Sequence, residues 1–438
     1  MSEMQRRVVI TGVGLICPLG SSKQELWEAL TTGRSGVCLL EQAGGDSLPL
    51  RFAAPARQFR DDDVECFGPL DKERRKAIRK GVKLMCRESQ MGVAAAQLAL
   101  ADAAIDLSAV DPERIGVSFG CDYMLSMPQE FIEGVRQCLD SQGRFDFSRW
   151  GTEGMSKMTP LWLLKYLPNM PASHVAIYND LRGPNNSLTH REASANICVG
   201  EAAQIIIRGG AEVMLAGATG TRLHPMKTIH AMQQEELADG DGDPAAASRP
   251  FDLNRTGMVL GEGAAAVVLE ELSHAQARNA TIYGEVAASA SSAVIQHKMV
   301  AHRDRALQHV LSGVLTAAEL MPEDIGHIHA HGLSTRSCDA AEAQAIARVF
   351  ASRRKPVPVV AAKSYFGNLG AGSGMVELIA SLLALAEGRL FPILNYTTAD
   401  PECPVAAVTD LSTPAGDSFI NLSVTPQAQA SAVLIRRM

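Results

Sequence analysis

Three short stretches of the chain carry side chains that can move protons or polarise a carbonyl group. Glu192 stands at the start of an apolar stretch with helical spacing, where the positive end of the helix dipole favours a carboxylate. His331 ends an apolar run, and Lys363 and Asn368 share the run Lys-Ser-Tyr-Phe-Gly-Asn. The carboxylate can act as a general base on water, and the imidazole or amide can donate a hydrogen bond to a carbonyl oxygen. The alternative for His331 is a purely structural histidine.

Apolar runs typical of strands alternate with helical stretches along most of the chain. Several runs are almost wholly apolar, as in strands buried on both faces, so the alternation predicts an α/β fold in layers. The predicted strands are residues 7–11, 115–119, 212–216, 264–270, 282–287, 325–330, 357–361, 418–423 and 432–436. The predicted helices are residues 23–32, 71–103, 193–208, 303–317, 339–350 and 373–385.

One segment, residues 129–158, interrupts this alternation. It is polar and aromatic with weak periodicity, which predicts a surface excursion with some helix. The alternatives are a cap over a pocket or a dimer contact.

Composition excludes several classes of protein. The 438 residues include 41 basic and 48 acidic side chains, and the net charge of −7 argues against nucleic-acid binding. The nine cysteines contain no Cys-x-x-Cys pair, which favours free thiols in a reducing cytosol over a zinc site or a disulfide framework. We recognise no signal peptide and no apolar run of membrane-spanning length, so we expect a cytoplasmic protein without a metal.

Five separated segments form a pattern that extends over nearly the whole chain. They contain Val-Ile-Thr-Gly-Val-Gly, the run from Gly-Pro-Asn to Gly-Glu-Ala around Glu192, Arg-Pro-Phe-Asp, His-Ala-His-Gly and the run ending at Asn368. In order and spacing these segments resemble the β-ketoacyl-[acyl-carrier-protein] synthase family, specifically its elongating type II branch and its polyketide relatives.

The resemblance implies a thiolase-like fold, in which two similar βαβαβαββ halves pack into a five-layer αβαβα sandwich. The halves would be residues 1–272, including the excursion 129–158, and residues 273–438. A dimer across an edge strand of the first half is also implied, either a homodimer or a heterodimer with a cysteine-bearing ketosynthase. Acyl groups would arrive on the phosphopantetheine of an acyl carrier protein, and no other cofactor is implied.

The resemblance also shows where this chain departs from the family. Glu192 falls on the reactive cysteine, His331 on the first catalytic histidine and Asn368 on the second, while Lys363 and Glu342 fall on positions that brace the site. A carboxylate is a poor acyl carrier because an acyl–carboxyl anhydride hydrolyses readily. Loss of the nucleophile of a covalent enzyme can cost roughly 10⁶ in turnover.

A loop near the C-terminus departs further. The family has Gly-Phe-Gly-Gly there, which supplies an acyl gate and part of an oxyanion hole. This chain has Thr425 in place of the gating phenylalanine, followed by Pro426, which has no N–H to donate. No substitute nucleophile is evident, since Cys198 lies almost two helical turns beyond the family's cysteine position and is expected to be a buried core thiol.

One stretch of this acidic chain is strongly basic. Carrier proteins are typically acidic, so a basic face on the predicted helix 71–103 is a candidate docking surface, with a solvated surface helix as the alternative. The residues expected to share the face are Lys72, Arg75, Lys76, Arg79, Lys80, Lys83 and Arg87, and those assigned to docking are Arg75, Lys76, Arg79, Lys80 and Lys83.

Three functions fit these observations. The first is a non-condensing homologue of fatty-acid or polyketide biosynthesis, acting as a chain-length-factor-like or scaffolding subunit. The second is a residual enzyme that uses Glu192, His331 and Asn368 to decarboxylate malonyl-carrier protein or to hydrolyse a thioester, although an ionised Glu192 would repel a malonate carboxylate. The third is an active elongating synthase. The altered residues favour the first, and the sequence leaves chain length, pathway and dimer type open.

Overall fold

A continuous path of paired strands runs through the molecule. The computed structural model describes residues 6–40, 50–61, 63–240 and 242–438. In the order in which they pair, the strands are β13 (Ala406–Ala407), β12 (Pro358–Val360), β11 (His327–His329), β14 (Ser418–Val424), β15 (Gln429–Arg436), β8 (Gly284–Ala293), β1 (Val8–Ile16), β7 (Leu260–Glu271), β6 (Val213–Thr221), β4 (Ile115–Cys121) and β5 (Asn185–Leu188).

The path consists of two half-sheets whose strands have the same order and the same relative directions. In β5-β4-β6-β7-β1 the first three strands are parallel, and β7 pairs antiparallel with both β6 and β1. The order β12-β11-β14-β15-β8 repeats this pattern in the second half of the chain. The half-sheets join through only two residue pairs between β1 and β8, Val9 with Glu285 and Ile10 with Gly284. These are the repeated halves that the sequence predicts, although the boundary at 272/273 stays a prediction.

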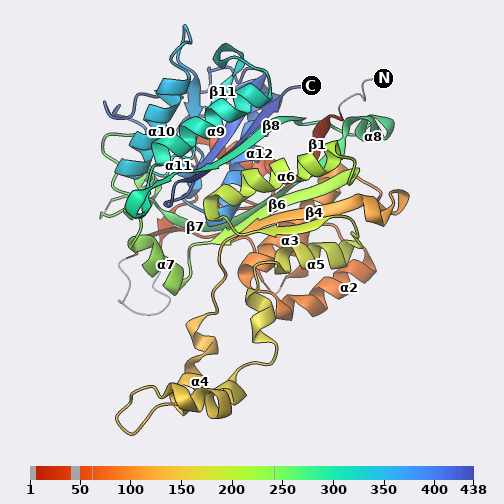
Figure 1. The fold of residues 1–438 in the computed structure, drawn as a ribbon, viewed down its shortest axis with the longest axis vertical. Helices are drawn as coiled ribbons and strands as arrows, with labels where there is room; N and C mark the ends of the chain where they lie inside the picture. Colours follow the sequence, from red (N-terminus) through yellow and green to blue (C-terminus); the bar gives the residue numbers. More distant parts are fainter. Residues whose placement is uncertain (1–5, 41–49, 62, 241) are drawn as a thin grey trace.

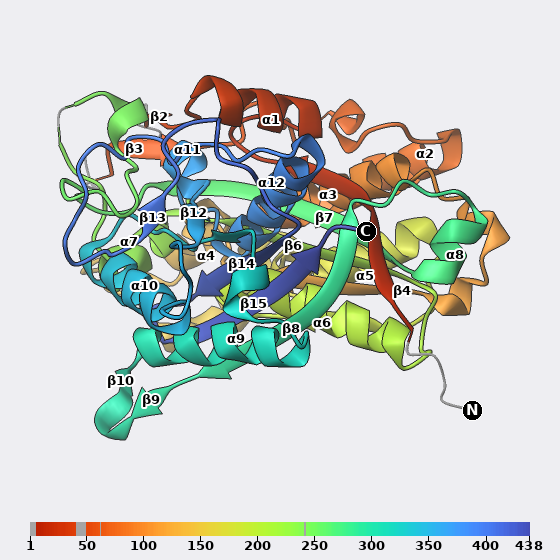
Figure 2. The ribbon, with the colours of Figure 1, turned by 90° about the horizontal axis from the view of Figure 1, so that it is seen from above.

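Helices form three layers around the half-sheets (Figure 1, Figure 2). The first half-sheet is covered on its outer face by α3 (Arg87–Ala103), with α5 (Met170–Asn179) beside it. The middle layer is α6 (Ser194–Ile207) and α12 (Ser373–Glu387), each of which contacts strands of both half-sheets. On the far side, α9 (Arg303–Ala317) covers β8 and β15, and α10 (Arg336–Val349) packs against it.

The middle layer explains the apolar composition of the stretch that contains the predicted helix 373–385. Within the described residues, the stretch Gly370–Glu387 is long and apolar enough to cross a membrane, and 89% of it is buried inside the protein. A helix that is apolar on all sides is expected where protein surrounds it, as here between two sheets. The expectation that no stretch reaches this length is therefore wrong, and the core position accounts for the composition.

The remaining elements are short. The segment 129–158 projects from the body of the molecule around α4 (Ile132–Gln137), and its rings Phe131, Phe145 and Trp150 pack on one another (Figure 1). The other elements are α1 (Lys23–Thr32), β2 (Cys38–Leu39), β3 (Phe52–Ala54), α2 (Lys72–Gly81), α7 (Pro225–Met232), α8 (Leu272–Ala277), β9 (Ile295–Gln296), β10 (Val300–Ala301) and α11 (Lys363–Phe366).

The single helix predicted over residues 71–103 is wrong. After α2 the chain forms a 3-10 turn at Val82–Leu84 and becomes extended at Met85 before α3 begins. Gly81 lies so close to Tyr178 that a Cβ there would be 1.7 Å from the tyrosine hydroxyl, and Met85 turns into the core. Burial of Met85 and the close approach at Gly81 outweigh the helical propensity of the stretch.

Because α2 ends at Gly81, the basic face is also shorter than the sequence predicts. Arg87 belongs to α3, where its guanidinium lies 2.7 Å from Glu262 and also pairs with Asp61, so it is not part of the face on α2. Lys83 lies beyond the end of α2, in the 3-10 turn.

Candidate active site

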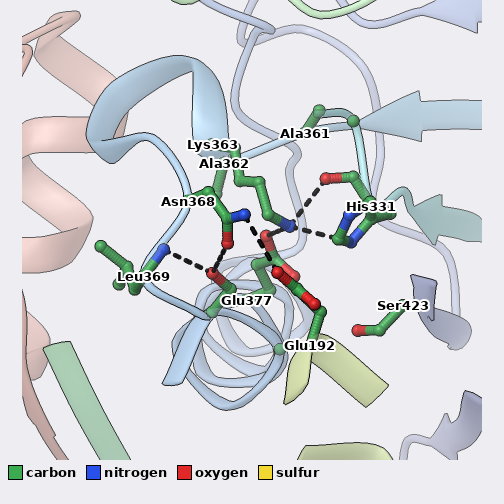
Figure 3. Close-up of polar contacts among 12 residues, drawn as sticks. Glu192, His331, Ala361, Ala362, Lys363, Asn368, Leu369, Glu377 and Ser423 are labelled. Carbon is green, nitrogen blue, oxygen red and sulfur yellow. Dashed lines mark hydrogen bonds and ion pairs between the residues drawn. The ribbon is translucent and has the colours of Figure 1, made fainter. Parts of the chain in front are cut away.

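Glu192 lies on a sharp turn that leads into the middle-layer helix α6. The turn Arg191–Ala193 precedes α6, and Arg191 has a φ of +53°, a left-handed conformation that is uncommon for a residue with a side chain. The turn directs Glu192 into the protein, where the residue is 2% exposed. Figure 3 shows its carboxylate facing Asn368, with His331 and Lys363 beside them.

An ion pair holds this carboxylate. Glu192 Oε1 accepts hydrogen bonds from Arg222 Nη2 at 2.5 Å and from Asn368 Nδ2 at 3.2 Å. Arg191 Nε lies 3.6 Å from Oε2, and Arg222 Nη2 is also 3.4 Å from Asp122 Oδ1. Arg222 is therefore shared by two buried carboxylates, while Glu192 faces two guanidinium groups.

The charges around Glu192 decide its ionisation. Burial favours the neutral acid, but the positive charges of Arg222 and then Arg191 outweigh it and hold the pKa of Glu192 well below its usual range. The carboxylate is therefore ionised at neutral pH, and it is a weaker base than a free glutamate.

His331 follows β11 and is held in one tautomer. Its backbone N–H donates to Glu342 Oε1 at 2.6 Å, and its Nδ1 lies 3.2 Å from Lys363 Nζ. An ammonium group can only donate, so Nδ1 accepts and Nε2 carries the proton of the neutral ring. Burial and then the charge of Lys363 lower the pKa of His331 well below its usual value, so the ring stays neutral. Lys363 is paired in turn with Glu377 at 2.5 Å.

Asn368 is oriented by the loop that carries it. Gly367 has a φ of +67°, and a Cβ there would lie 2.5 Å from the carbonyl oxygen of Val259, so only glycine fits this close approach. Asn368 Oδ1 accepts from the Gly370 N–H at 3.0 Å and from the Ser373 hydroxyl at 3.3 Å. These acceptor contacts leave Nδ2 as the donor to the carboxylate.

The loop at Thr425 and Pro426 is a tight hairpin turn between β14 and β15. The Thr425 N–H donates to the Gln429 carbonyl oxygen at 2.9 Å, and the Ala428 N–H donates to the Thr425 carbonyl oxygen at 3.0 Å. Since Pro426 has no N–H, neither of the first two residues of the turn has a free backbone donor for an oxyanion.

The cavity at the centre of these residues is very small. It has a volume of about 10 Å³, which is room for about one water molecule. Its lining includes Glu192, Arg222, Glu235, Met258, His331, Cys338, Asn368, Thr425 and Pro426. The structure therefore brings together the predicted Glu192, His331, Asn368, Thr425 and Pro426, with Lys363 directly behind His331.

Arg222 and Cys338 are among the cavity residues that were missed from the sequence. Arg222 follows directly on β6, and a charged residue at the end of a wholly buried strand is the signal that marks it. Cys338 lines the cavity with its thiol, and burial raises the pKa of that thiol well above its usual value, so it is a neutral thiol and not a nucleophile. Cys198 is fully buried in α6, as predicted.

The residues assigned to docking lie elsewhere, on the outer surface of α2 and the turn after it. Arg75 is paired with Glu65, whereas four cations form no ion pair within the described part of the chain and are exposed. These four are Lys76, Arg79, Lys80 and Lys83. No three His, Cys, Asp or Glu side chains of the described residues are grouped so as to hold a metal ion.

Two models of known protein families match most of the chain. Residues 5–275 match the family model described as "Beta-ketoacyl synthase, N-terminal domain", and residues 283–397 match "Beta-ketoacyl synthase, C-terminal domain". The chain belongs to the β-ketoacyl synthase family, and the predicted thiolase-like α/β fold is confirmed.

Relatives come from both fatty-acid and polyketide biosynthesis. The chain is 31% identical over 400 residues to the 3-oxoacyl-[acyl-carrier-protein] synthase 2 of Synechocystis sp., covering 91% of this chain and 90% of the relative. It is 32% identical to the ketoacyl synthase alpha subunit of the tetracenomycin polyketide synthase of Streptomyces glaucescens, covering 93% and 91%. A solved β-ketoacyl synthase from Burkholderia phymatum superposes with a TM-score of 0.85 at 29% identity, covering 99% of this chain and 100% of that one.

The first prediction concerns the strength of the buried ion pair. Arg222→Met should lower the free energy of unfolding by about 3–5 kcal/mol, because it leaves the Glu192 and Asp122 carboxylates without their shared cation. Glu192→Gln should cost less, since Arg222 keeps Asp122. The double variant should recover part of the Arg222→Met loss in a double-mutant cycle measured by urea unfolding. If Arg222→Met and the exposed Arg354→Met lowered the free energy of unfolding equally, the result would contradict a stabilising ion pair between Arg222 and Glu192.

The second prediction follows from the ionisation of Glu192. Its pKa is lower in the folded than in the unfolded chain, so the carboxylate stabilises the fold above the unfolded value of about 4.3, and this stabilisation is lost as the pH falls. The stability of the wild type relative to Glu192→Gln, which cannot titrate, should decrease by roughly 1–2 kcal/mol between pH 6 and pH 3. A difference that stays constant in urea unfolding over this range would show that Glu192 is not held ionised.

Proposed function

We propose that this protein is a non-condensing member of its family, a chain-length-factor-like or scaffolding subunit of fatty-acid or polyketide biosynthesis. The observation that carries the proposal is the ionised Glu192, paired with Arg222 at the position of the family's reactive cysteine. A carboxylate that is already neutralised by a guanidinium is a weak nucleophile, and an anhydride formed on it would hydrolyse. The chain therefore has no group at this position that can store an acyl chain.

Two further features support the proposal. The cavity of about 10 Å³ beside Glu192 has no room for an acyl chain. The turn at Thr425 and Pro426 offers no free N–H at its first two positions to stabilise a tetrahedral intermediate. Nucleophile, acyl space and oxyanion donors are thus altered together.

A residual enzyme is the second candidate, because two donors at the site are retained. His331 carries its proton on Nε2, and Asn368 offers its amide, so both can polarise a thioester carbonyl. Against it, the negative charge of Glu192 repels a malonate carboxylate, and the low pKa of Glu192 makes it a weak general base near neutral pH.

The partners we propose are an acyl carrier protein and a second ketosynthase subunit, in a homodimer or a heterodimer with a cysteine-bearing synthase. The name of the Synechocystis relative includes the carrier protein, and the cations of α2 have the charge to attract an acidic one. The projecting segment 129–158 is a candidate for the contact between subunits. All nine cysteines are free, which suits the reducing cytoplasm where we place the protein.

The third prediction tests the function directly. Incubation of the purified chain with acetyl-, octanoyl- and malonyl-carrier protein should leave the intact masses of the chain and of the carrier proteins unchanged, because Glu192 cannot store an acyl group. An active elongating synthase serves as the positive control. Acylation of this chain would refute the proposal, and malonyl-to-acetyl conversion or hydrolysis of the acyl carrier that Glu192→Gln abolishes would establish the residual enzyme instead.

The fourth prediction tests docking on α2. Reversal of three exposed cations, in the variant Lys76→Glu, Arg79→Glu, Lys80→Glu, should weaken binding of an acidic acyl carrier protein by roughly tenfold or more at low salt, since like charges then face the carrier. The difference from wild type should shrink in 1 M salt, where the Debye length is about 3 Å. Lys355→Glu in the second half of the chain is the matched control. If titration calorimetry gives the triple variant and Lys355→Glu the same affinity for the carrier protein, the cations of α2 are only a solvated surface and not a docking site.

A further inference from the structure

Arg222 stands in a position built to hold its guanidinium next to residue 192. It is among the largest fully buried side chains of the described chain, and it extends from the end of β6 to Glu192 and Asp122. Gly370, with a φ of +64°, passes over it so closely that a Cβ there would lie 3.3 Å from Arg222 Nε and 2.2 Å from Asp122 Oδ2. Glycine at this position makes room for the Arg222–Asp122 pair.

The guanidinium takes up space in the small cavity that Glu192 also lines. Arg222 and Glu192 line the same cavity, whose volume of about 10 Å³ holds about one water molecule. A cysteine side chain has three non-hydrogen atoms fewer than that of Glu192, which is the size of an acetyl group, whereas an octanoyl group has nine. We infer that Arg222 is a second block to acylation, which excludes long acyl chains from this site whatever residue stands at position 192. The inference deepens the proposed non-condensing function and rests on it.

The block does not depend on Glu192, because Arg222 has a second partner. With its distance of 3.4 Å to Asp122, Arg222 keeps a buried counter-charge when Glu192 is replaced. A thiol introduced by Glu192→Cys would lie beside a cation, which lowers the pKa of a thiol and favours the reactive thiolate. Restoring the nucleophile therefore gives a reactive sulfur with no space for a long acyl chain, and the missing nucleophile and the missing space can be tested separately.

The test compares acyl loading of three variants in a Cys338→Ala background, which removes the other thiol of the cavity. The variants are Glu192→Cys, Glu192→Cys with Arg222→Ala, and Glu192→Cys with Arg222→Met. The probes are the acetyl and octanoyl thioesters of N-acetylcysteamine. In the reaction, the thiolate attacks the carbonyl carbon, a new C–S bond forms, the C–S bond of the donor breaks, and N-acetylcysteamine leaves as a thiolate that takes up a proton. Intact mass and peptide mapping locate the acyl group.

Removal of the Arg222 side chain should open the site. We expect Glu192→Cys with Arg222→Ala to load octanoyl at least about 10²-fold faster than Glu192→Cys alone, the scale of rate loss that misplacement of reacting atoms produces. Acetyl, which fits the space left by the Glu192 side chain, should load onto both variants. The variant with Arg222→Met should stay slow, since methionine fills much of the same space without a charge. Equal octanoyl loading by Glu192→Cys alone and by the Arg222→Ala double variant would overturn the inference, and fast octanoyl loading with Arg222→Met would show that charge and not volume closes the site.

Two controls separate this inference from the proposed function and from misfolding. The Arg222→Ala double variant removes one positive and one negative buried charge, so the cavity keeps its charge balance. Glu192→Cys with Arg222→Ser, which offers Asp122 a hydroxyl, is a second opened variant, and circular dichroism and thermal unfolding check every fold. Acylation of the Cys338→Ala chain with Glu192 intact would refute the non-condensing function itself, whereas equal octanoyl rates with and without Arg222 would refute only the second block.

Discussion

The ion pair between Glu192 and Arg222 is the constraint on which the candidate site depends. A carboxylate moved from water into a protein interior loses several kcal/mol of hydration, and only a well-placed cation and hydrogen bonds restore it. Arg222 supplies the charge and Asn368 supplies a further hydrogen bond. Arg222 needs its own second partner, Asp122, and that pair in turn requires a glycine at position 370. The carboxylate at position 192 is thus accommodated by three separate segments of the chain, around Asp122, around Arg222 and at residues 368–370.

The residues beside the ion pair form a second network of contacts. His331 is fixed through its backbone by Glu342 and through its ring by Lys363, and Lys363 is fixed by Glu377 on α12. None of these contacts involves the carboxylate of Glu192. The contacts that fix His331 and Lys363 therefore do not depend on the side chain at position 192.

Most of the strands and helices could be predicted from the sequence, because the apolar pattern that marks a buried strand or helix is local. The helices at 23–32 and 303–317 have the predicted bounds, and every predicted strand is present. The features that the sequence did not predict depend on contacts between distant parts of the chain. The helix over 71–103 breaks where Gly81 meets Tyr178, and Arg222 pairs with a residue 30 positions away across the middle of the fold. Periodicity carries no information on such contacts, whereas the motif at Glu192 does locate its side chain.

The contact between Glu192 and Arg222 is an ion pair and not an apolar contact, and this difference bears on the function of the site. Replacing a buried ion pair by apolar residues of similar volume is often neutral or stabilising, so stability alone is a weak reason for two charges at this position. The same pair has consequences that an apolar replacement would lack. Ionised Glu192 would repel the carboxylate of a malonyl group, and the guanidinium of Arg222 holds Glu192 ionised in the small cavity that both residues line. Both effects depend on charge, which apolar side chains of the same volume would not supply.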